Sequence, residues 1–281
     1  MVFTKIKSHA KINLALNITG KKSSLHDLES VVAFISLYDE IYIKRSKLKY
    51  HNISFVGKFG NNIGKVNTIF SLLQLLDKHK LLKNQKFIIK VKKNIPSKAG
   101  LGGGSMNAAS ILRYFFKKKI IKTTHNRIIQ ISKLIGSDVV LGLKNNNLIL
   151  TSQGKIKYFQ SNKKIYVLII KPSFGCSTKY IYSKIKKFEK PKLNHPRKKM
   201  FNFQFLKRMN NALEPIAFSK YPKLKSIKLY LESLKKTSFV RMTGSGSALV
   251  AYFQSKQSCE SAKKKAIKKY KNFWCISSKT I

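Results

Sequence analysis

A run of glycines at a strand-to-helix junction limits how this chain can fold more than any other feature of the sequence. Residues 86–92 have the pattern of a strand, residues 104–117 that of a helix, and four of the five residues 100–104 are glycine. Glycine allows positive φ and close approach of the backbone to a ligand. The first turn of a helix offers unpaired N–H groups and a partial positive charge. The pattern therefore predicts a β–loop–α unit whose loop binds a phosphate-like anion.

This loop matches neither of two common nucleotide-binding patterns. No Lys follows Gly104, as a P-loop would require, and Ser105 occupies the place of the third glycine of the dinucleotide pattern. A flexible turn that binds nothing is the alternative interpretation.

A second glycine segment, Thr243-Gly244-Ser245-Gly246, lies between two strand-like runs. Taken alone, it is typical of a hairpin turn with glycines at positive φ. Together with the first loop it predicts the second wall of one phosphate site.

Hydrophobic periodicity predicts an α+β chain of two domains. Residues 11–19 alternate between apolar and polar side chains, which is the period of a half-buried strand. The first half has strands with inserted helices, and the second half follows the order β–α–α–β–β–α–β. A boundary near residue 155 gives domains of residues 1–155 and 156–281. The expected strands are 11–19, 29–36, 40–44, 51–56, 86–92, 147–152, 164–170 and 273–276, with a strand–glycine–strand unit at 238–253; the expected helices are 64–81, 104–117, 126–134, 178–188, 203–218, 224–234 and 258–270.

The charge is strongly one-sided, with 58 Lys and Arg against 10 Asp and Glu and a formal net charge of +48. Such a charge suggests nucleic acid as a partner. Two observations oppose this: only six of the cations are Arg, the better ligand for phosphates and bases, and the lysines are spread along the whole chain. We expect no specific nucleic-acid partner and interpret most of the charge as a background that destabilises the fold by self-repulsion.

Composition also limits the class of protein. Hydrophobic residues make up 43%, enough for a real core. Apolar runs such as 165–170 are far shorter than the ~20 residues that a membrane helix needs, and the first residues show no apolar signal-peptide region. Three cysteines without C-x-x-C spacing argue against a disulfide scaffold or zinc ribbon. We expect a cytoplasmic protein without a membrane partner.

Two charged residues stand at positions where chemistry is possible. Asp138 follows Gly136-Ser137 and precedes an apolar run, 139–141, that we expect to be a buried strand, so it is either a cap or a catalytic base. Lys11 stands at the start of the strand at 11–19, where an ordinary solvated lysine is the simple alternative. The histidines lack metal-ligand spacing, and no G-x-S-x-G motif is present, which disfavours a hydrolase.

Three segments together resemble the motifs of the galactokinase–homoserine–mevalonate–phosphomevalonate (GHMP) kinase superfamily: 10–14, 100–105 and 243–246. Supporting matches are the turn 19–21 leading to His26, Asn107-Ala108-Ala109, and the segments 136–139, 211–215 and 241–246. They occur in order from residue 8 to about residue 253, nearly the whole chain.

The resemblance implies a two-domain fold, with an N-terminal domain like domain 2 of ribosomal protein S5 and a ferredoxin-like C-terminal domain. It implies that ATP and a small-molecule substrate bind between them. The implied reaction transfers the γ-phosphoryl group to the 2-hydroxyl of 4-diphosphocytidyl-2-C-methyl-D-erythritol, in non-mevalonate synthesis of isoprenoid precursors. Mg²⁺ is expected with ATP; its ligands are open, with Ser105 as one candidate, and the oligomeric state is open as well.

The resemblance also implies roles for individual residues. Asp138 would be the general base and Lys11 its partner, an ammonium that keeps the carboxylate ionised. Asn13, on the same strand face as Lys11, can orient the hydroxyl, while His26 and Tyr182 would bind the cytosine end of the substrate. Thr243, Gly244, Ser245 and Gly246 would form the second wall of the phosphate site. The ATP-binding residues would be Pro96, Ser97, Lys98, Ala99, Gly100, Leu101, Gly102, Gly103, Gly104, Ser105 and Met106.

The chain departs from the family pattern at two places. His9 replaces the usual proline of the first motif, and Leu25 replaces the aromatic residue that normally precedes the histidine. Leucine is a poorer stacking partner for a base, so this chain departs most from the family pattern among the residues expected to recognise cytosine. A GHMP kinase of the homoserine or mevalonate type and, less favoured, a basic nucleic-acid-binding protein are the alternatives.

Overall fold

The computed structural model describes residues 2–22, 25–61, 63–160 and 164–281, with Lys22 and Leu25 described by their backbone alone. The chain forms two compact units. Unit 1 consists of Met1–Ala10, Leu37–Ser97 and Gly102–Asn145, and unit 2 of Lys11–Ser36, Lys98–Leu101 and Asn146–Ile281. The chain thus enters each unit more than once, and the glycine loop is shared between them.

Two long strands, β1 (Thr4–Lys22) and β2 (Leu25–Ser46), supply residues to both units. They belong to a six-stranded sheet of order β3-β4-β2-β5-β6, in which β1 also pairs with β2. The strand expected at 11–19 is confirmed, and those expected at 29–36 and 40–44 are parts of β2. The strand is continuous through residues 37–39, where Asp39 is fully buried and hydrogen-bonded.

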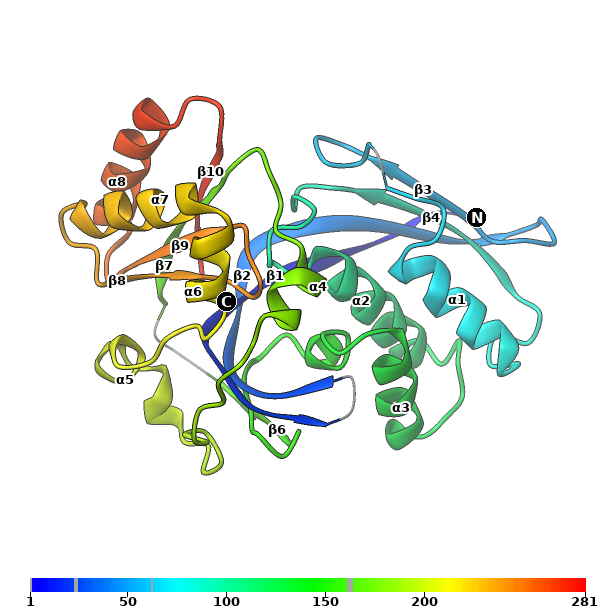
Figure 1. Cartoon of the computed structure of the whole chain (residues 1–281). Helices are drawn as coiled ribbons and strands as arrows, with labels where there is room; N and C mark the ends of the chain where they lie inside the picture. Colours follow the sequence, from blue (N-terminus) through cyan, green and yellow to red (C-terminus); the bar gives the residue numbers. More distant parts are fainter. Residues whose placement is uncertain (1, 23–24, 62, 161–163) are drawn as a thin grey trace. The chain divides into compact units, whose positions relative to one another are not determined.

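Unit 1 combines strands with three helices. Strand β4 (Lys86–Lys92) pairs antiparallel with Glu40–Ser46 of β2, and β3 (Asn52–Val56) lies parallel to β4. The helices are α1 (Thr68–Lys78), α2 (Gly103–Lys117) and α3 (His125–Ile135), and Figure 1 shows them grouped on one side of β3 and β4. Helix α1 buries Ile69, Leu72, Leu73 and Leu76 at helical spacing.

The apolar run 139–141 is not the strand that we expected. A turn at residues 137–139 leads into a short 3₁₀ helix, η1 (Val140–Leu143), whose residues are all buried. An apolar run this short does not distinguish a buried strand from a buried helical turn. Asp138 therefore precedes a helical turn, and its carbonyl oxygen accepts a hydrogen bond from Leu141 N at 3.2 Å.

Unit 2 contains the remaining strands of the first sheet and a second sheet. Strand β5 (Asn147–Leu150) pairs with residues 30–32 of β2, and β6 (Ile156–Phe159), which the sequence pattern missed, pairs with β5. The second sheet is antiparallel, of order β10-β7-β9-β8. Its strands are β7 (Tyr166–Lys171), β8 (Phe239–Met242), β9 (Leu249–Phe253) and β10 (Trp274–Lys279).

Helices α7 (Pro222–Ser233) and α8 (Lys256–Lys269) pack on this second sheet. The strands of the expected order β–α–α–β–β–α–β and its last helix are found, but four α-helices rather than two lie between β7 and β8. The helix expected at 203–218 is two, α5 (Phe203–Lys207) and α6 (Glu214–Lys220), separated by residues that bond to β1. The helix expected at 178–188 ends at Ser183 as α4 (Thr178–Ser183). A short 3₁₀ helix, η2 (Lys198–Phe201), completes the elements.

Two further observations concern the cysteines and the apolar character of the helices. All three cysteines are unpaired, and burial raises the pKa of the Cys176 thiol to about 11. Within the described ranges, no helix is both long and apolar enough to cross a membrane.

Candidate functional site

The first half of the glycine loop, Lys98–Leu101, lies against the turn between β8 and β9 in unit 2. Ser247 N donates to Lys98 O at 3.2 Å, and Ala248 N donates to Ala99 O at 3.3 Å. Gly100 has a φ of +72°, and a Cβ there would lie 1.9 Å from Thr243 O. Only glycine fits this position, so the close contact between the two segments explains one of the loop's glycines.

The second glycine segment forms that turn. Gly244 and Gly246 both have positive φ, +54° and +87°, as expected for a hairpin turn. The Asn211 side chain stabilises the turn, because its Nδ2 donates to the carbonyl oxygens of Met242 and Gly244 at 2.8 Å each. The structure therefore brings together the two glycine segments that the sequence singled out.

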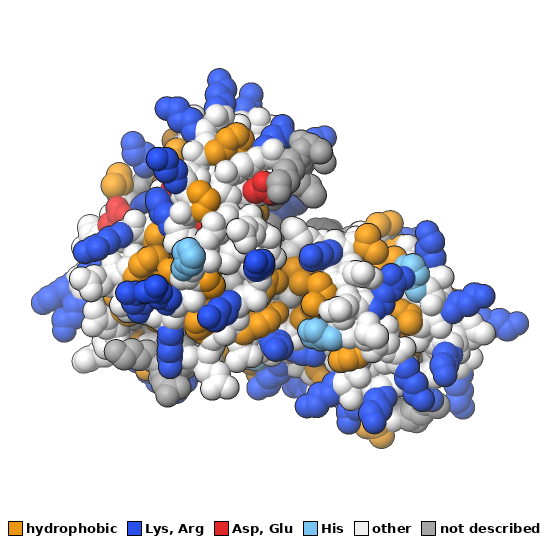
Figure 2. Space-filling view, turned by 90° about the horizontal axis from the view of Figure 1, so that it is seen from below, with side chains coloured by type: hydrophobic (Ala, Val, Ile, Leu, Met, Phe, Trp, Pro, Cys, Tyr) orange, Lys and Arg blue, Asp and Glu red, His pale blue; other side chains and the backbone are white. Residues whose placement is uncertain are grey.

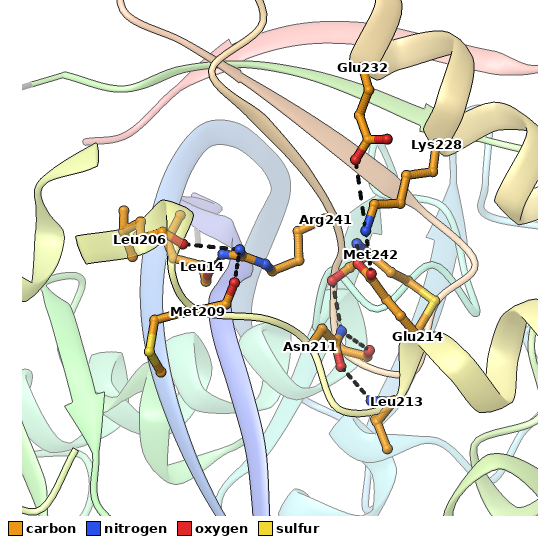
Figure 3. Close-up of polar contacts among 11 residues, drawn as sticks. Leu14, Leu206, Met209, Asn211, Leu213, Glu214, Lys228, Glu232, Arg241 and Met242 are labelled. Carbon is orange, nitrogen blue, oxygen red and sulfur yellow. Dashed lines mark hydrogen bonds and ion pairs between the residues drawn. The ribbon is translucent and has the colours of Figure 1, made fainter. Parts of the chain in front are cut away.

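Two buried charged residues support the turn, and Figure 3 shows both. The Glu214 carboxylate accepts from Met242 N at 2.7 Å and pairs with Lys228 Nζ at 2.7 Å. The Arg241 guanidinium donates to three backbone carbonyls, those of Leu14, Leu206 and Met209, and burial lowers its pKa. Because these donors and acceptors satisfy each other away from water, the turn has little freedom to move.

Lys11 and Asn13 lie together on β1, as their spacing predicted, and both are 3% exposed. Lys11 Nζ donates to Asn13 Oδ1 at 2.7 Å, and Asn13 Nδ2 donates to Ser30 Oγ at 2.8 Å. The buried position of Lys11 argues against an ordinary solvated lysine, since buried ammonium groups are costly.

The same part of β1 is tied to both glycine segments. Asn13 N donates to Thr243 Oγ1 at 3.1 Å, and Thr243 Oγ1 donates to Gly100 O at 3.1 Å. Lys11 N donates to Leu101 O at 3.1 Å. A continuous network in unit 2 thus fixes the Lys11 backbone relative to the loop.

The second half of the loop begins helix α2 in unit 1. Gly102, with a φ of +69°, precedes the helix, and no side chain caps it. A Cβ on Gly103 would lie 3.0 Å from Ile95 Cγ2, while one on Gly104 would lie 3.2 Å from Thr68 Oγ1. Gly104 is exposed and Ser105 partly exposed. An uncapped, accessible helix N-terminus of this kind is suited to binding an anion.

Asp138 lies in unit 1, in the turn after α3, with its side chain half-buried. Its neighbour Gly136 ends α3. The sequence left a cap and a catalytic base as alternatives for this residue, and its backbone carbonyl accepts from Leu141 N at the start of η1.

His26 and Tyr182 come together in unit 2, with ring centroids 5.4 Å apart. Burial, and next the charge of Lys21, lower the pKa of His26, which favours a neutral imidazole that can both donate and accept a hydrogen bond. The ring of Phe188, 48% exposed, lies 6.5 Å from His26. The Leu25 side chain, which departs from the family pattern, lies outside the described residues.

Sequence reasoning missed the residues that support this site. Thr68 Oγ1 donates to Gly104 O at 2.8 Å, and Ser30 orients Asn13. Phe188 follows α4 where we expected the helix to continue, so its approach to His26 had no signal in the local pattern. Glu214 could have been found, because few acids are present and it lies in a segment that matches the family.

Across the residues that the structure describes, no group of three or more His, Cys, Asp or Glu side chains could hold a metal ion. Mg²⁺ bound with a nucleotide takes phosphate and water oxygens and needs only one or two protein carboxylates. The site is compatible with such an ion.

Two family models match the chain. The model described as GHMP kinases N terminal domain matches residues 67–146, and the one described as GHMP kinases C terminal matches residues 185–272. The first includes the whole glycine loop and Asp138, and the second includes the turn between β8 and β9. Together with the observed elements, they confirm the α+β, two-domain fold; the boundary at residue 155 lies between them and stays a prediction.

The chain is similar to known proteins over nearly its whole length. It is 56% identical to 4-diphosphocytidyl-2-C-methyl-D-erythritol kinase of Pelagibacter ubique, over 99% of both chains. It is 32% identical to the protein of the same name from Clostridium tetani, over 99% of this chain and 100% of that one. A crystal structure of 4-(cytidine 5'-diphospho)-2C-methyl-D-erythritol kinase superposes with a TM-score of 0.77 at 21% identity, covering 99% of this chain and 100% of that one. Homoserine kinase from Cytophaga hutchinsonii gives a TM-score of 0.72 at 14% identity, covering 100% and 95%.

Proposed function

Because the chain belongs to the GHMP kinase family, we propose that it uses ATP to phosphorylate the 2-hydroxyl of 4-diphosphocytidyl-2-C-methyl-D-erythritol. The observation that carries this substrate is the 56% identity to the Pelagibacter ubique kinase over 99% of both chains. The product is an intermediate in the non-mevalonate synthesis of isoprenoid precursors.

The glycine loop binds the ATP phosphates in this proposal. The uncapped N-terminus of α2 supplies backbone N–H groups, and the missing Cβ atoms of Gly103 and Gly104 leave room for close approach. The proposed ATP-binding segment is 96–106, and residues 243–246 hold its first half in place through the contacts with Gly100.

Asp138 and Lys11 carry the chemistry in this proposal, by their match to the family motifs. The new bond joins the substrate 2-oxygen to the γ-phosphorus, the bond to the β-phosphate oxygen breaks, and the hydroxyl proton passes to the Asp138 carboxylate. The Lys11 ammonium offsets negative charge that develops during transfer. Asn13, which accepts from Lys11 Nζ at 2.7 Å, orients the hydroxyl.

His26 and Tyr182 bind the cytosine end. A neutral imidazole can pair with the polar edge of a base, and an aromatic ring offers a face for stacking. Their rings lie 5.4 Å apart in unit 2, so one base can contact both side chains.

Mg²⁺ accompanies ATP, where it neutralises charge on the phosphates that the loop holds. Three unpaired cysteines and the use of ATP fit a reducing compartment, which supports the cytoplasm as the location.

A coupled assay of ADP release tests the proposed function. The purified protein is given ATP and Mg²⁺ with 4-diphosphocytidyl-2-C-methyl-D-erythritol, homoserine or mevalonate in turn. We expect turnover with the cytidyl substrate alone. Turnover with mevalonate or homoserine and none with the cytidyl compound would overturn the proposal while leaving the family intact.

A further inference from the structure

One buried carboxylate, that of Asp39, bonds in unit 1 to the two segments that flank the glycine loop. These segments, called the arms of the loop below, are residues 93–95 before it and Asn107 after it. Its Oδ1 accepts from Asn94 N at 2.7 Å and Ile95 N at 2.9 Å. Its Oδ2 accepts from Asn107 Nδ2 at 3.1 Å and pairs with Lys93 Nζ. The chain leaves unit 1 after residue 97 and returns at residue 102. The carboxylate therefore bonds to the chain shortly before residue 97, where the chain leaves unit 1, and shortly after residue 102, where it re-enters the unit.

This arrangement is specific to a negatively charged group. The Asp39 side chain is fully buried, and its four hydrogen-bonding partners are all donors. Asn107 must turn its Nδ2 toward Asp39, because an ionised carboxylate only accepts. Its Oδ1 is then left without a hydrogen-bond partner among the described residues. An unsatisfied buried acceptor is costly, so the contact with Asp39 determines how Asn107 lies.

Lys93 places a second charge directly beside the start of α2. Its side chain is 4% exposed, and a Cβ on Gly103 would lie 3.2 Å from Lys93 Nζ. A cation is unfavourable near a helix N-terminus, which already carries partial positive charge. Asp39 offsets this charge in the protein, and an anion bound at the helix N-terminus offsets it further. The unfavourable free energy of placing the Lys93 ammonium at this helix N-terminus therefore decreases when phosphate binds.

We propose that Asp39 and Lys93 are positioning residues for the triphosphate: Asp39 fixes the spacing of the two loop arms, and Lys93 raises the affinity of the α2 N-terminus for phosphate. This inference rests on the proposed function only in taking ATP as the ligand. It predicts a selective effect on nucleotide affinity, which a residue that merely stabilises the fold would not have.

Asn107→Ala is the first test, because it cuts the returning arm and keeps the ion pair. We expect the Kd of a fluorescent ATP analogue, and the KM for ATP, to rise about tenfold, equivalent to ~1.4 kcal/mol, with no change in the KM for the alcohol substrate. Asp39→Asn turns one acceptor into an amide donor that faces Lys93 and Asn107, so its effect on Kd should be larger. In the double variant Asp39→Asn/Lys93→Met, the unpaired cation is gone; the melting temperature should recover, but the affinity should not.

Asp77→Asn is the matched control in the same unit. Asp77 also pairs with a lysine, Lys86, and with His51, neither of which belongs to the loop, so the variant should lower the melting temperature without changing the Kd of the analogue. The inference is overturned if Asn107→Ala and Asp39→Asn bind the analogue as tightly as the wild type. If the wild type binds the analogue in an Asp39-dependent way but phosphorylates none of the three alcohols, the proposed function fails and the inference stands.

Discussion

At the scale of single residues, burial separates Lys11, together with Lys93, from the other lysines that the structure describes. Lys11 is 3% exposed and bonded to Asn13, whereas most of the chain's lysines are at least partly exposed. Asp138 differs from the other acids in sequence context, because it follows a glycine that ends α3 and precedes a buried turn. These two residues are where the proposed chemistry can be tested most simply.

Replacing either residue should remove most turnover and leave the fold intact. Asp138→Asn keeps the shape of the side chain but cannot accept the hydroxyl proton, and Lys11→Ala removes the ammonium charge. We expect steady-state kcat/KM to fall by well over about tenfold, a barrier change above ~1.4 kcal/mol. Circular dichroism of both variants should match the wild type. Activity within that tenfold range for either one would refute its assigned role.

His51 predicts how stability depends on pH. Burial lowers the pKa of His51 below its ordinary value of 6.5, with Asp77 opposing the shift, and Phe87 N donates to His51 Nδ1 at 3.1 Å. The unfolded chain thus takes up a proton at a higher pH than the native one. The free energy of unfolding should therefore fall as pH drops through 6.5.

Denaturant titrations between pH 7 and pH 5 measure this dependence. His51→Gln cannot be protonated, so its stability should change less over the same range than that of the wild type. Equal slopes for the two proteins would show that other groups cause the dependence.

At the scale of elements, the sequence predicted those helices and strands that are determined by residues close together in the chain. The strand at 86–92, the helix after the glycine run and the strands of the second sheet were predicted, because periodicity and glycine placement decide them. The split of 203–218 into α5 and α6 was not, since it depends on a contact with a distant strand, in which Ala212 N donates to Leu16 O. The turn at Asp138 and the approach of Phe188 to His26 depend on tertiary packing in the same way.

The site shows the same division. Both glycine segments and the pair Lys11 and Asn13 could be found from motifs, whereas Asp39, Thr68 and Ser30 carry no motif and act through contacts. The only signal for Asp39 in the sequence was an acidic residue between the two strands expected at 29–36 and 40–44.

Gly100 tests whether the two glycine segments must touch. Gly100→Ala adds a Cβ that would lie 1.9 Å from Thr243 O at a φ of +72°. The backbone strain of about 1–2 kcal/mol and a steric cost of about 1–3 kcal/mol should both reduce the free energy of unfolding. ATP affinity should fall as well, because the loop has to move.

Gly154→Ala is the control, with nearly the same φ of +74° but nothing within 4 Å of the added Cβ. It should show the strain alone and normal ATP affinity. If the two variants lost the same stability and affinity, the contact with Thr243 would not matter.

At the scale of the whole molecule, the charge of +48 is the dominant property. Figure 2 shows Lys and Arg side chains over the whole face in view, with few acidic ones. Like charges repel across the surface and lower the stability of the folded state. Salt weakens this repulsion, because the screening length falls to about 10 Å at 0.1 M.

The melting temperature should therefore rise with ionic strength. Between about 0.02 M and about 0.5 M NaCl we expect an increase of several degrees, in line with ~1 kcal/mol per 2–4 °C for a chain of this size. Differential scanning calorimetry in chloride measures it, and repeating the series with a second monovalent salt controls for specific ion binding. A melting temperature that falls or stays constant would contradict net self-repulsion.

The central claim is that this chain transfers a phosphoryl group from ATP to the cytidyl substrate. Phosphorus-31 NMR of the reaction with ATP, Mg²⁺ and 4-diphosphocytidyl-2-C-methyl-D-erythritol observes the new bond directly. The account predicts one new phosphomonoester resonance on the substrate, with its diphosphate resonances retained and ADP formed in equal amount. ADP accompanied only by inorganic phosphate, or an unchanged substrate spectrum, would contradict it.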